Sequence, residues 1–539
     1  MKVVIVGGVA GGMSAATRLR RLDESAEIIV FERGAHVSFA NCGLPYYVGG
    51  VIPKRESLLL QTPDSLAARF RLDVRVRHEV IAVDPHGRTV TVRELESGRE
   101  FTESFDELVL STGASAIVPP LPGVERALVL RDVEDVDRMV AALGDARSAV
   151  VTGAGFIGVE MAENLVRQGI STTLVERGPQ LLAPLDPEMA APVTAELRAR
   201  GVRVEMNAEL ARIDADTVTL ADGRTVPADV VVMAIGVRPE SALARTAGLE
   251  IGSGGGIVVD ATLRTSVPHI YAVGDAVQKR DAVGGQAALI PLANAANRQG
   301  RMVADVIAGL PVSDPPALGT AILGVFDLTV AMTGWSEKRL RAAGRPFRAV
   351  HTHPLAHAGY YPGASALSLK LLVDPDTDEI LGAQAVGGSG VDKRIDVLAT
   401  AMAGGIRASR LMDLELAYAP QFGSAKDPVN MLGYLADNLR TGALRTLQWH
   451  EVAERVSAGT QLVDVRSPEE FAAGSIPGAR NIPLDELRER SAEIPAGPIL
   501  AFCQVGQRGN SATRLLTHLG REAFNLDGGY RTWSATQPS

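Results

Sequence analysis

Two glycine-rich turns place the strongest constraint on how this chain can fold. The segment KVVIVGGVAGGMSAATRLRRL (2–22) runs from a β-branched stretch through glycines into an amphipathic helical pattern, and AVVTGAGFIGVEMAENLVRQG (149–169) repeats that order. A strand, a tight glycine turn and a helix form the first half of a dinucleotide-binding βαβ unit. The second turn has the complete G-x-G-x-x-G spacing at Gly153, Gly155 and Gly158, with Phe156 and Ile157 between them. We therefore predict an α/β chain with two Rossmann-like dinucleotide-binding domains.

The first turn departs from that spacing. Val9 holds the middle position, and the surrounding residues are Gly7, Gly8, Ala10, Gly11 and Gly12. Glycines still let the backbone approach a pyrophosphate, which would lie against the unpaired N–H groups of the helix that follows.

Each turn is followed by an apolar run that ends in a carboxylate. Glu32 ends EIIVFER and Glu176 ends STTLVE, at the distance where a carboxylate can accept hydrogen bonds from a ribose. Glu176 favours NADH because it would repel a 2′-phosphate, although Arg177 beside it leaves NADPH open.

Composition narrows the class of protein. The 539 residues carry a net charge of -9 at pH 7, which gives no support for binding to nucleic acid or to a membrane surface. Two cysteines cannot form a disulfide framework, so each is a candidate reactive thiol in a reducing compartment. No apolar run approaches the roughly 20 residues of a membrane helix. We expect a cytoplasmic protein, and we predict no metal site.

Three further segments carry a specific resemblance. TSVPHIYAVGDAV (265–277) puts Asp275 after an apolar strand, and LVLSTGA (108–114) and VVMAIGVRPE (231–240) have the pattern of strands that pass between two domains. With the two turns, they resemble the flavoprotein disulfide reductases, in which such an aspartate binds the FAD ribityl chain. The resemblance implies a discontinuous FAD-binding domain at 1–115 and 240–322, and an NAD(P)H-binding domain at 116–239.

The resemblance also implies a set of cofactor contacts around these segments. Its members are Gly7, Gly8, Val9, Ala10, Gly11, Gly12, Glu32, Arg33, Ser38, Asn41, Val80, Ser111, Thr112, Gly113, Gly153, Gly155, Phe156, Ile157, Gly158, Glu160, Glu176, Arg177, Gly236, Gly274, Asp275, Pro291, Leu292 and Ala293.

The motif SFANCGLPYY (38–47) holds Cys42 without a partner cysteine nearby. It resembles the single-cysteine branch of the family, which comprises NADH oxidases, NADH peroxidases and coenzyme A disulfide or persulfide reductases. A reactive thiolate needs a locally electropositive site or several hydrogen-bond donors, whereas a buried inert cysteine is the structural alternative. The oxidase and peroxidase pattern has a histidine in the first glycine turn, where this chain has Ala10. The reductase function is therefore favoured; an NADH oxidase and a slow sulfane-sulfur sensor remain alternatives.

The helix after the first turn presents a candidate site for coenzyme A. Ser14, Arg18 and Arg21 recur at i, i+4 and i+7, so they share one helix face and could bind phosphates. A solvated charged face is the structural alternative. The predicted coenzyme A set is completed by Ser38, Asn41, Lys426 and Arg298, with Asn297 as the alternative to Arg298.

Two later segments, HTHPLAHAGYYPGASAL (351–367) and YAPQFGSAKDPVNMLGY (418–434), resemble parts of the coenzyme A disulfide reductases. The resemblance implies an α+β dimerisation domain at 323–440. It also implies that one tyrosine from each segment reaches the partner's cysteine in a homodimer. Tyr360 and Tyr418 are the candidates, with Tyr361 as a substitute for the first.

After a linker at 441–449, the remaining chain (450–539) resembles an α/β rhodanese domain. LVDVRSPEEFAAGSIPGARNIPLDEL (462–487) leads to CQVGQRGNSAT (503–513), in which Cys503 and Arg508 form C-x-x-G-x-R between a strand and a helix. Successive backbone N–H groups there could surround the sulfur anion of a persulfide. A phosphatase loop is the competitor, but it has five residues between cysteine and arginine, and this loop has four. Asp464 and Arg466 are expected to brace the loop.

Together these features predict a homodimeric FAD enzyme that takes electrons from NADH, with NADPH possible, and reduces sulfur–sulfur bonds through Cys42. The expected substrates are coenzyme A persulfide, polysulfide and coenzyme A disulfide. Small-molecule thiols and persulfides are thus the expected partners, with Cys503 as the sulfur carrier of the rhodanese domain.

Overall fold

The computed structural model describes residues 1–537 and divides into two compact units. The first unit comprises Met1–Leu181 and Leu197–Gly319, and the second comprises Leu182–Glu196 with the chain from Thr320 onward. The segment Leu182–Glu196, which the sequence placed in the predicted NAD(P)H-binding domain, thus packs with the second unit.

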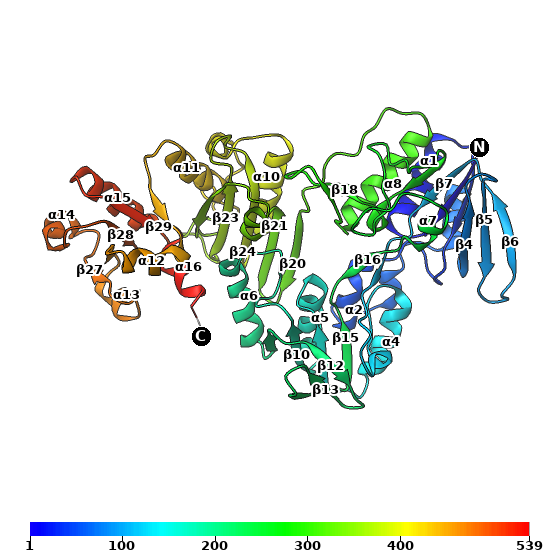
Figure 1. Ribbon diagram of the computed structural model, residues 1–539, viewed down its shortest axis with the longest axis horizontal. Coiled ribbons are helices and arrows are strands. Elements are labelled where there is room, and N and C mark those ends of the chain that lie inside the picture. Colours follow the sequence, from blue (N-terminus) through cyan, green and yellow to red (C-terminus); the bar gives the residue numbers. More distant parts are fainter. Residues whose placement is uncertain (538–539) are drawn as a thin grey trace. The chain divides into compact units, whose positions relative to one another are not determined.

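The first unit begins with a parallel sheet that carries the first glycine turn (Figure 1). Its strands, in spatial order, are β17 (Ile270–Ala272), β7 (Glu107–Leu110), β1 (Lys2–Val6), β2 (Glu27–Phe31) and β3 (Asp73–Arg75). The central strand β1 is apolar on both faces because helices and loops cover both, and Val3, Val4 and Ile5 are fully buried. A central first strand with β2 and β3 on one side and β7 on the other is the Rossmann order.

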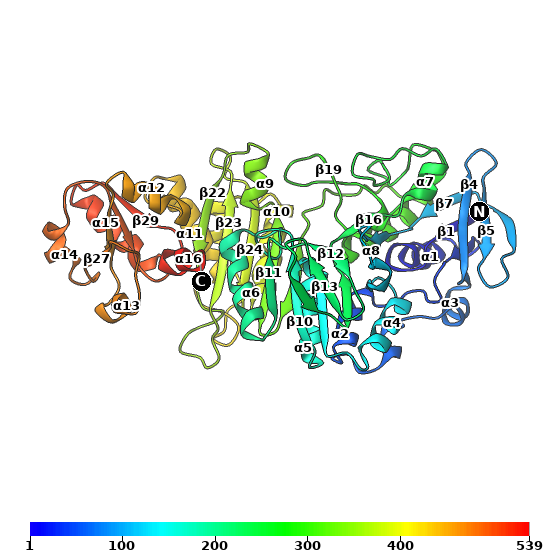
Figure 2. The same cartoon turned by 60° about the horizontal axis from the view of Figure 1, so that its bottom comes forward.

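Two helices cover one face of this sheet, α1 (Ala10–Leu22) and α8 (Ala293–Ile307), which lie side by side in Figure 2. Ala15 and Leu19 of α1 share an apolar core with Val303 of α8. A Cβ atom added at Gly300 would lie 2.2 Å from the Gly11 carbonyl oxygen, so glycine is needed where the helices approach. The first glycine turn is therefore held between the sheet and two closely packed helices.

A second parallel sheet carries the complete fingerprint. Its strands are β11 (Arg203–Met206), β10 (Ser171–Glu176), β9 (Ser148–Thr152) and β15 (Val230–Met233), in that spatial order. Helix α5 (Phe156–Arg167) follows β9 through the turn, and buries Val159, Met161 and Leu165. Both predicted dinucleotide units therefore have the strand, turn and helix expected of them.

Smaller elements complete the first unit. Where the two predicted crossover segments meet, β8 (Ala114–Ala116) pairs antiparallel with β16 (Val237–Pro239). Among the described residues, three small antiparallel sheets are also present. The first contains β4 (His78–Asp84), β5 (Thr89–Glu94) and β6 (Glu100–Ser104), and the second contains β12 (Leu210–Ile213), β13 (Thr217–Leu220) and β14 (Thr225–Pro227). The third pairs β18 (Lys279–Arg280) with β19 (Ala287–Ala288). The remaining helices are α2 (Leu44–Val48), α3 (Pro63–Phe70), α4 (Val133–Leu143) and α7 (Ala242–Thr246).

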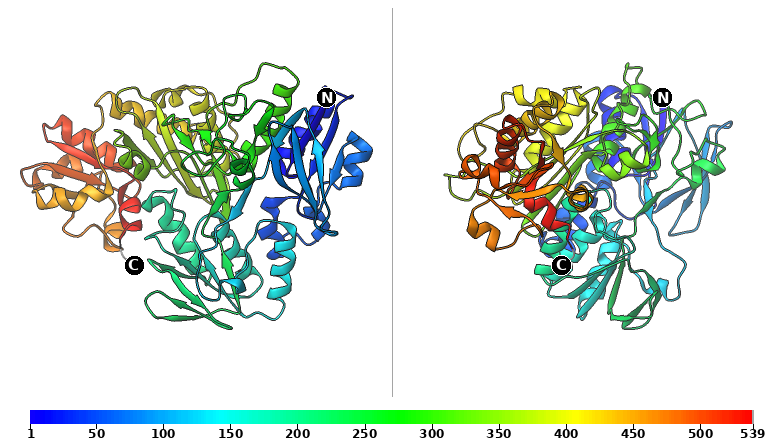
Figure 3. Two further views of the ribbon diagram at one scale, coloured as in Figure 1. Left: turned by 45° about the vertical axis from the view of Figure 1, so that its right-hand side comes forward. Right: turned by 60° about the vertical axis from the view of Figure 1, so that its left-hand side comes forward.

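The second unit contains a five-stranded antiparallel sheet. Its spatial order is β20 (Ala321–Val325), β21 (Leu328–Gly334), β24 (Ile380–Gly387), β23 (Leu367–Val373) and β22 (Arg348–Thr352). Helices α10 (Val391–Ala403) and α11 (Pro428–Arg440), yellow in Figure 3, pack their apolar sides on this sheet through a shared core that includes Leu369, Leu398 and Leu432. The other helices here are α9 (Glu337–Ala342) and α6 (Pro187–Ala199), which begins in the segment Leu182–Glu196.

The last part of the second unit, orange to red in Figure 3, is a parallel sheet with its own helices. Its strands are β25 (Thr446–Leu447), β29 (Ala523–Leu526), β28 (Ile499–Phe502), β26 (Gln461–Asp464) and β27 (Arg480–Asn481), in spatial order. The helices are α12 (Val452–Ser457), α13 (Pro468–Ala472), α14 (Leu487–Arg490), α15 (Gln507–His518) and α16 (Gly529–Ala535). The predicted fold class, with two Rossmann-type sheets, an α+β domain and a terminal α/β domain, is confirmed.

Within residues 1–537, every helix is too short or too polar to cross a membrane.

Candidate functional site

The first glycine turn is closed by backbone contacts that leave no room for side chains. Gly7 has a φ of +100°, and a Cβ there would lie 2.2 Å from the Ser111 carbonyl oxygen. A Cβ at Gly12 would lie 1.9 Å from the Gly7 carbonyl oxygen. Glu32, at the end of β2, accepts a hydrogen bond from the Gly8 N–H at 2.8 Å. The turn and the carboxylate are therefore fixed beside the N-terminus of α1.

The second turn repeats this construction. Gly153 has a φ of +93°, and a Cβ at Gly158 would lie 1.8 Å from the Gly153 carbonyl oxygen. Glu176 accepts hydrogen bonds from the Ala154 N–H at 2.8 Å and the Gly178 N–H at 2.7 Å. In contrast, a Cβ at Gly155 would meet nothing within 4 Å in the described chain. This open space at the start of α5 lies where a pyrophosphate would approach.

Asp275 lies directly after β17, as the sequence predicted. Its Oδ1 atom is buried and has no hydrogen-bond partner among the described residues, and the same is true of the Nε atom of Arg131. The two side chains face each other, with Arg131 Nη2 3.9 Å from Asp275 Oδ2. Burial raises the pKa of Asp275. Unsatisfied buried polar atoms need a partner, so these residues fit a ligand with hydroxyl or phosphate groups, such as FAD.

The other predicted cofactor residues surround these turns. Ser38 donates its N–H to the Gly8 carbonyl at 2.8 Å, and the Asn41 side chain donates to the Arg131 carbonyl at 2.5 Å. The Thr112 hydroxyl donates to a backbone carbonyl at 2.6 Å. Six further members of the set flank the turns and carboxylates: Arg33, Val9, Ala10, Phe156, Ile157 and Arg177. Gly11 lies in α1. The others lie in or next to β4, β7, β16, β17 and α8: Val80, Ser111, Gly113, Gly236, Gly274, Pro291, Leu292 and Ala293.

Cys42 is a free, solvent-exposed thiol in a short 3-10 helix (Asn41–Gly43). Its pKa is raised by desolvation, then by the carboxylates of Glu160 and Asp275, while Arg131 lowers it. The protein groups alone therefore do not make this site electropositive, which differs from the expectation for a thiolate. Two carboxylates outweigh one guanidinium around the sulfur.

Tyr46 was missed by the sequence reasoning. It follows Cys42 by four residues, and its hydroxyl donates to Glu160 Oε1 at 2.9 Å. Burial and Glu160 raise the pKa of Tyr46, and burial also raises the pKa of Glu160. The spacing of four residues on a helical segment could have indicated a phenol on the same side as the thiol.

The predicted coenzyme A face of α1 is present, but it is partly engaged. Arg18 Nε donates to Asp305 Oδ1 at 2.7 Å, and the Ser14 hydroxyl donates to Asn297 Oδ1 at 2.7 Å. Arg21 is exposed, and Arg298 lies 3.4 Å from Asp314. Two members of the set, Ser14 and Asn297, are thus brought together, and Arg18 retains part of its guanidinium for a ligand. Lys426 is exposed in the second unit.

The two predicted tyrosines meet. The hydroxyl oxygens of Tyr360 and Tyr418 lie 2.8 Å apart. Their side chains are exposed, with 76% and 48% of their surface accessible. Tyr361 instead packs edge-on against His357, so Tyr360 is the better candidate of the pair.

Cys503 is fully buried at the end of β28, before α15. The Cys503 carbonyl accepts the Tyr530 N–H at 2.8 Å, and the Gln504 carbonyl accepts the Arg531 N–H at 2.9 Å. These bonds occupy the loop carbonyls and leave the loop N–H groups for a ligand. Arg466 forms a buried ion pair with Asp464 at 2.8 Å and donates to Gln504 Oε1 at 2.9 Å, which braces the loop as predicted.

Arg508 is paired with Glu470, a residue that the sequence reasoning did not single out. Two Arg508 nitrogens donate to the two Glu470 oxygens, each at 2.7 Å. The guanidinium lowers the pKa of Glu470 to about 2, and Glu470 and Cys503 together raise the pKa of Arg508. The signal available in the sequence was Ser467, three residues before Glu470, which forms a capping box for α13.

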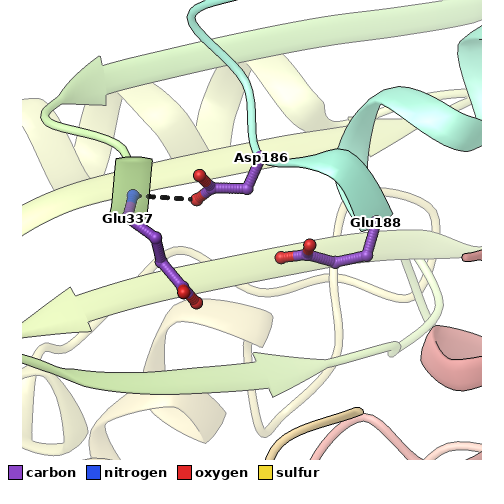
Figure 4. Close-up of side chains that lie close together, drawn as sticks. All are labelled: Asp186, Glu188 and Glu337. Atoms are coloured by element: carbon purple, nitrogen blue, oxygen red, sulfur yellow. Dashed lines mark hydrogen bonds between the residues drawn. The ribbon is translucent and has the colours of Figure 1, made fainter. Parts of the chain in front are cut away.

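Three buried carboxylates converge in the second unit, Asp186, Glu188 and Glu337 (Figure 4). The space between these carboxylates is occupied by the ammonium of Lys370. Lys370 Nζ is 2.9 Å from Asp186 and 2.7 Å from Glu337, and it also contacts Glu188. The carboxylates hold the pKa of Lys370 above its usual range despite complete burial. The cluster is therefore a buried ion network in which an ammonium balances carboxylate charge.

These features define a class: a nucleotide-dependent oxidoreductase with two dinucleotide units, an exposed free thiol and a separate cysteine loop. The chain belongs to the pyridine nucleotide-disulphide oxidoreductase family, whose model matches residues 1–300. The dimerisation domain of that family matches residues 320–428, and a rhodanese-like domain matches residues 448–536. The family implies FAD and NAD(H) as cofactors.

Individual relatives agree with this assignment. Coenzyme A disulfide reductase from Staphylococcus aureus is 36% identical over 438 residues, which are 81% of this chain and 99% of that protein. The crystal structure of reduced Bacillus anthracis CoADR-RHD is 47% identical, covers 99% of this chain and 98% of its own, and has a TM-score of 0.97. An NAD-dependent persulfide reductase from A. fulgidus is 37% identical, covers 99% of this chain and 100% of its own, and has a TM-score of 0.93.

Proposed function

We propose that this protein reduces sulfur–sulfur bonds of coenzyme A persulfide, polysulfide and coenzyme A disulfide with electrons from NADH. The observation that carries the proposal is Cys42, an exposed free thiol in a disulfide oxidoreductase fold whose sequence has no second cysteine nearby. With no internal disulfide to form, Cys42 must pair with a sulfur of the substrate. The names of the relatives, coenzyme A disulfide reductase and persulfide reductase, support the same substrate class.

The residues fit both cofactors. The glycine turn at Gly7–Gly12, Glu32, Arg131 and Asp275 would hold FAD, and the turn at Gly153–Gly158 with Glu176 would hold NADH. When bound, FAD supplies the transfer of two electrons from NADH to a disulfide at Cys42. Glu176 supports NADH because its carboxylate is already oriented by two backbone N–H groups.

Cys42 acts as the nucleophile in this proposal. Its thiolate attacks one sulfur of coenzyme A disulfide, a Cys42–S–S–coenzyme A bond forms, and coenzyme A thiolate leaves. With coenzyme A persulfide, attack on the inner sulfur gives the same mixed disulfide and releases HS⁻. Two electrons then restore the Cys42 thiolate and release coenzyme A thiolate.

The raised pKa of Cys42 gives the surrounding groups a role. The thiol must lose its proton before attack, and the phenol of Tyr46 with Glu160 lies one helical turn away. Glu160 accepts a hydrogen bond from Tyr46, so the pair can orient a proton near the sulfur. The phosphates of bound coenzyme A would contact Ser14, Arg18, Arg21 and Arg298.

A homodimer completes the site. The family dimerisation domain supports this assembly, and the hydrogen-bonded Tyr360–Tyr418 pair is exposed on it. We place that pair against Cys42 of the partner subunit, where a phenol can donate a proton to the leaving thiolate.

Cys503 is proposed to carry sulfane sulfur for the reductase. The loop carbonyls are engaged by α16, so the loop N–H groups and Arg508 can face a terminal sulfur anion. A phosphatase activity would use the same kind of loop, and phosphate ester hydrolysis by the chain would identify it.

An anaerobic assay of NADH oxidation tests the function. Coenzyme A persulfide, polysulfide and coenzyme A disulfide should each drive turnover in the wild type, and Cys42→Ser should abolish it. Cys503→Ser should lower sulfide release from persulfide donors while it spares reduction of coenzyme A disulfide. Turnover retained in Cys42→Ser would overturn the proposal. Fast oxygen consumption without a sulfur substrate would identify an NADH oxidase instead, and FAD binding with slow turnover on every substrate a sensor.

A further inference from the structure

A fully buried histidine of the antiparallel sheet contacts the end of the rhodanese sheet. His351, in β22, donates from Nδ1 to Asp527 Oδ2 at 2.6 Å and from Nε2 to Glu188 Oε1 at 3.1 Å. Its backbone N–H also donates to both Asp527 oxygens, at 3.2 and 3.1 Å. Asp527 directly follows β29, so one carboxylate of the rhodanese sheet is bound by a residue outside it.

Two successive glycines connect this carboxylate to the Cys503 loop. Gly528 and Gly529 both have a φ of +67°. A Cβ at Gly528 would lie 3.0 Å from His351 Cβ, whereas a Cβ at Gly529 would lie 2.5 Å from the Cys503 carbonyl oxygen. The backbone is therefore packed against the histidine on one side and against the cysteine loop on the other. We call residues 527–531 the bridge segment.

The bridge segment determines which way the cysteine loop faces. Its Tyr530 and Arg531 N–H groups bind the carbonyls of Cys503 and Gln504, so those carbonyls point toward the bridge. In successive peptide units, the N–H groups that bind an anion must point the other way. A shift of the bridge would rotate these peptides and change the number of N–H groups that reach the sulfur.

The charges around His351 keep the bridge in place. Glu188 comes from α6, Asp527 from the bridge, and the ammonium of Lys370 from β23. His353, directly after β22, is held neutral because burial lowers its pKa. The His353 ring forms hydrogen bonds with the hydroxyls of Ser368, at 2.9 Å, and of Thr532 in α16, at 2.8 Å. The contact is thus a hydrogen-bonded ion pair inside a packed junction, where loss of one partner leaves the other charge uncompensated.

We propose that His351 and Asp527 are positioning residues for sulfur transfer at Cys503: they fix the bridge segment, which orients the N–H groups of the cysteine loop. The proposal rests on the proposed role of Cys503 as a sulfur carrier. In that role the Cys503 thiolate attacks the outer sulfur of thiosulfate, sulfite leaves, and a Cys503 persulfide anion forms. Cyanide then removes the outer sulfur as thiocyanate and restores the thiolate, and the loop must stabilise the anion between the two steps.

The test measures sulfur transfer from thiosulfate to cyanide by the full-length holoenzyme. Asp527→Asn and His351→Gln keep hydrogen-bonding groups but remove one charge each, and both should lower kcat at least fivefold. Asp427→Asn is the matched control, because Asp427 is equally buried and pairs with Arg394 away from the rhodanese sheet. It should leave kcat within twofold of the wild type.

A second readout separates positioning from simple stability. Peptide mapping after brief iodoacetamide treatment reports both cysteines in one sample. The alkylation rate of Cys503 should fall at least threefold in the two variants, while that of Cys42 stays within twofold. The double variant should lie closer to the wild type than either single variant, since no charge is then left without its partner in this pair. Lower melting temperatures with unchanged kcat and unchanged Cys503 alkylation would overturn the proposal.

Asp527→Glu decides the question if the neutral variants do not fold. It retains the ion pair but lengthens the side chain by one methylene, which must displace either the histidine or the bridge. We expect a folded protein with kcat lowered at least threefold, and an unchanged kcat would refute positioning. Cys503→Ser tests the underlying role separately: sulfur transfer retained in that variant would remove the proposed function of Cys503, whatever His351 does.

Discussion

The hydroxyls of Tyr360 and Tyr418 lie 2.8 Å apart, although 58 residues separate them in the sequence. Both phenols are exposed, so little of the stability of the unit depends on their contact. Two exposed aromatic side chains that share a hydrogen bond form a ready proton donor for a group that docks against them. Because of this geometry, we expect the removal of a single hydroxyl group to lower kcat.

Replacement of either phenol tests that expectation. Tyr360→Phe and Tyr418→Phe each remove one hydroxyl and should lower kcat for coenzyme A disulfide about tenfold or more, within the usual range for general acid catalysis. The melting temperature should stay within about 2 °C, because exposed substitutions change stability little. Tyr434→Phe, also exposed, is the control. Equal kcat values for all three variants would remove the pair from catalysis.

The second glycine turn offers a matched pair of variants. Gly158→Ala would place a methyl group 1.8 Å from a backbone oxygen, so it should unfold or distort this domain. Gly155→Ala meets no protein atom within 4 Å in the described chain, so the fold should tolerate it. If the pyrophosphate of NADH lies there, Gly155→Ala should raise the Kd for NADH at least tenfold and leave the bound FAD unchanged. Isothermal titration measures the Kd for NADH, and flavin absorbance measures the bound FAD. An unaltered Kd would place the nucleotide elsewhere.

His351 predicts a pH dependence of stability. Asp527 and Glu188 outweigh desolvation and raise the pKa of His351 to about 9, against 6.5 for the ordinary imidazole. The unfolded chain then releases its proton at lower pH than the folded chain does. The stabilisation is therefore complete below pH 6.5 and is lost as the pH rises through 9. It is on the order of 3 kcal/mol.

Thermal unfolding between pH 6 and 10 measures this contribution. The wild type should lose stability steadily over the upper part of that range. His351→Gln, which cannot be protonated, should start lower and have a flatter profile between pH 7 and 9. Parallel profiles for the two proteins would show that His351 is neutral in the fold.

Lys370 predicts a large loss of stability. Lys370→Met leaves Asp186, Glu188 and Glu337 buried together without their cation, which should lower the free energy of unfolding by about 3–5 kcal/mol. Lys426→Met, at an exposed lysine, should change it by less than about 0.5 kcal/mol. Because the ammonium already occupies the space between the carboxylates, Ca²⁺ or Mg²⁺ should not raise the melting temperature of the wild type. A rise of several degrees would indicate a metal site instead.

The sequence predicted those parts of the fold that local pattern determines. A glycine turn after a β-branched run has few conformations available, and Glu32 and Glu176 lie near their turns because the intervening helix has a standard length. The same holds for the Cys503 loop, since a strand and a helix enclose it. Resemblance then supplied Tyr360 and Tyr418, which no local pattern would have brought together.

The contacts that sequence could not predict join residues far apart in the chain. Glu188 and Lys370 are 182 residues apart, and His351 and Asp527 are 176 apart. A lone buried lysine in an apolar strand, LSLKLLV, indicates that a partner exists, but it does not say which carboxylate supplies it. The surroundings of Cys42 were unpredictable for the same reason, because Glu160 comes from α5 and Asp275 from the segment after β17, both far from Cys42 in the sequence.

The position of Glu188 has a practical meaning for anyone who wishes to study parts of this protein alone. The chain leaves its first unit after Leu181, returns at Leu197, and leaves again after Gly319. A fragment that starts at residue 320 would hold Lys370 and His351 but neither Asp186 nor Glu188. Lys370 would keep only Glu337 and His351 only Asp527 of the carboxylates that surround them, so part of the compensating negative charge would be lost. The domain boundaries predicted from the sequence therefore differ from the boundaries of the folded units. A soluble fragment would need residues 182–196 to be joined to it through a linker.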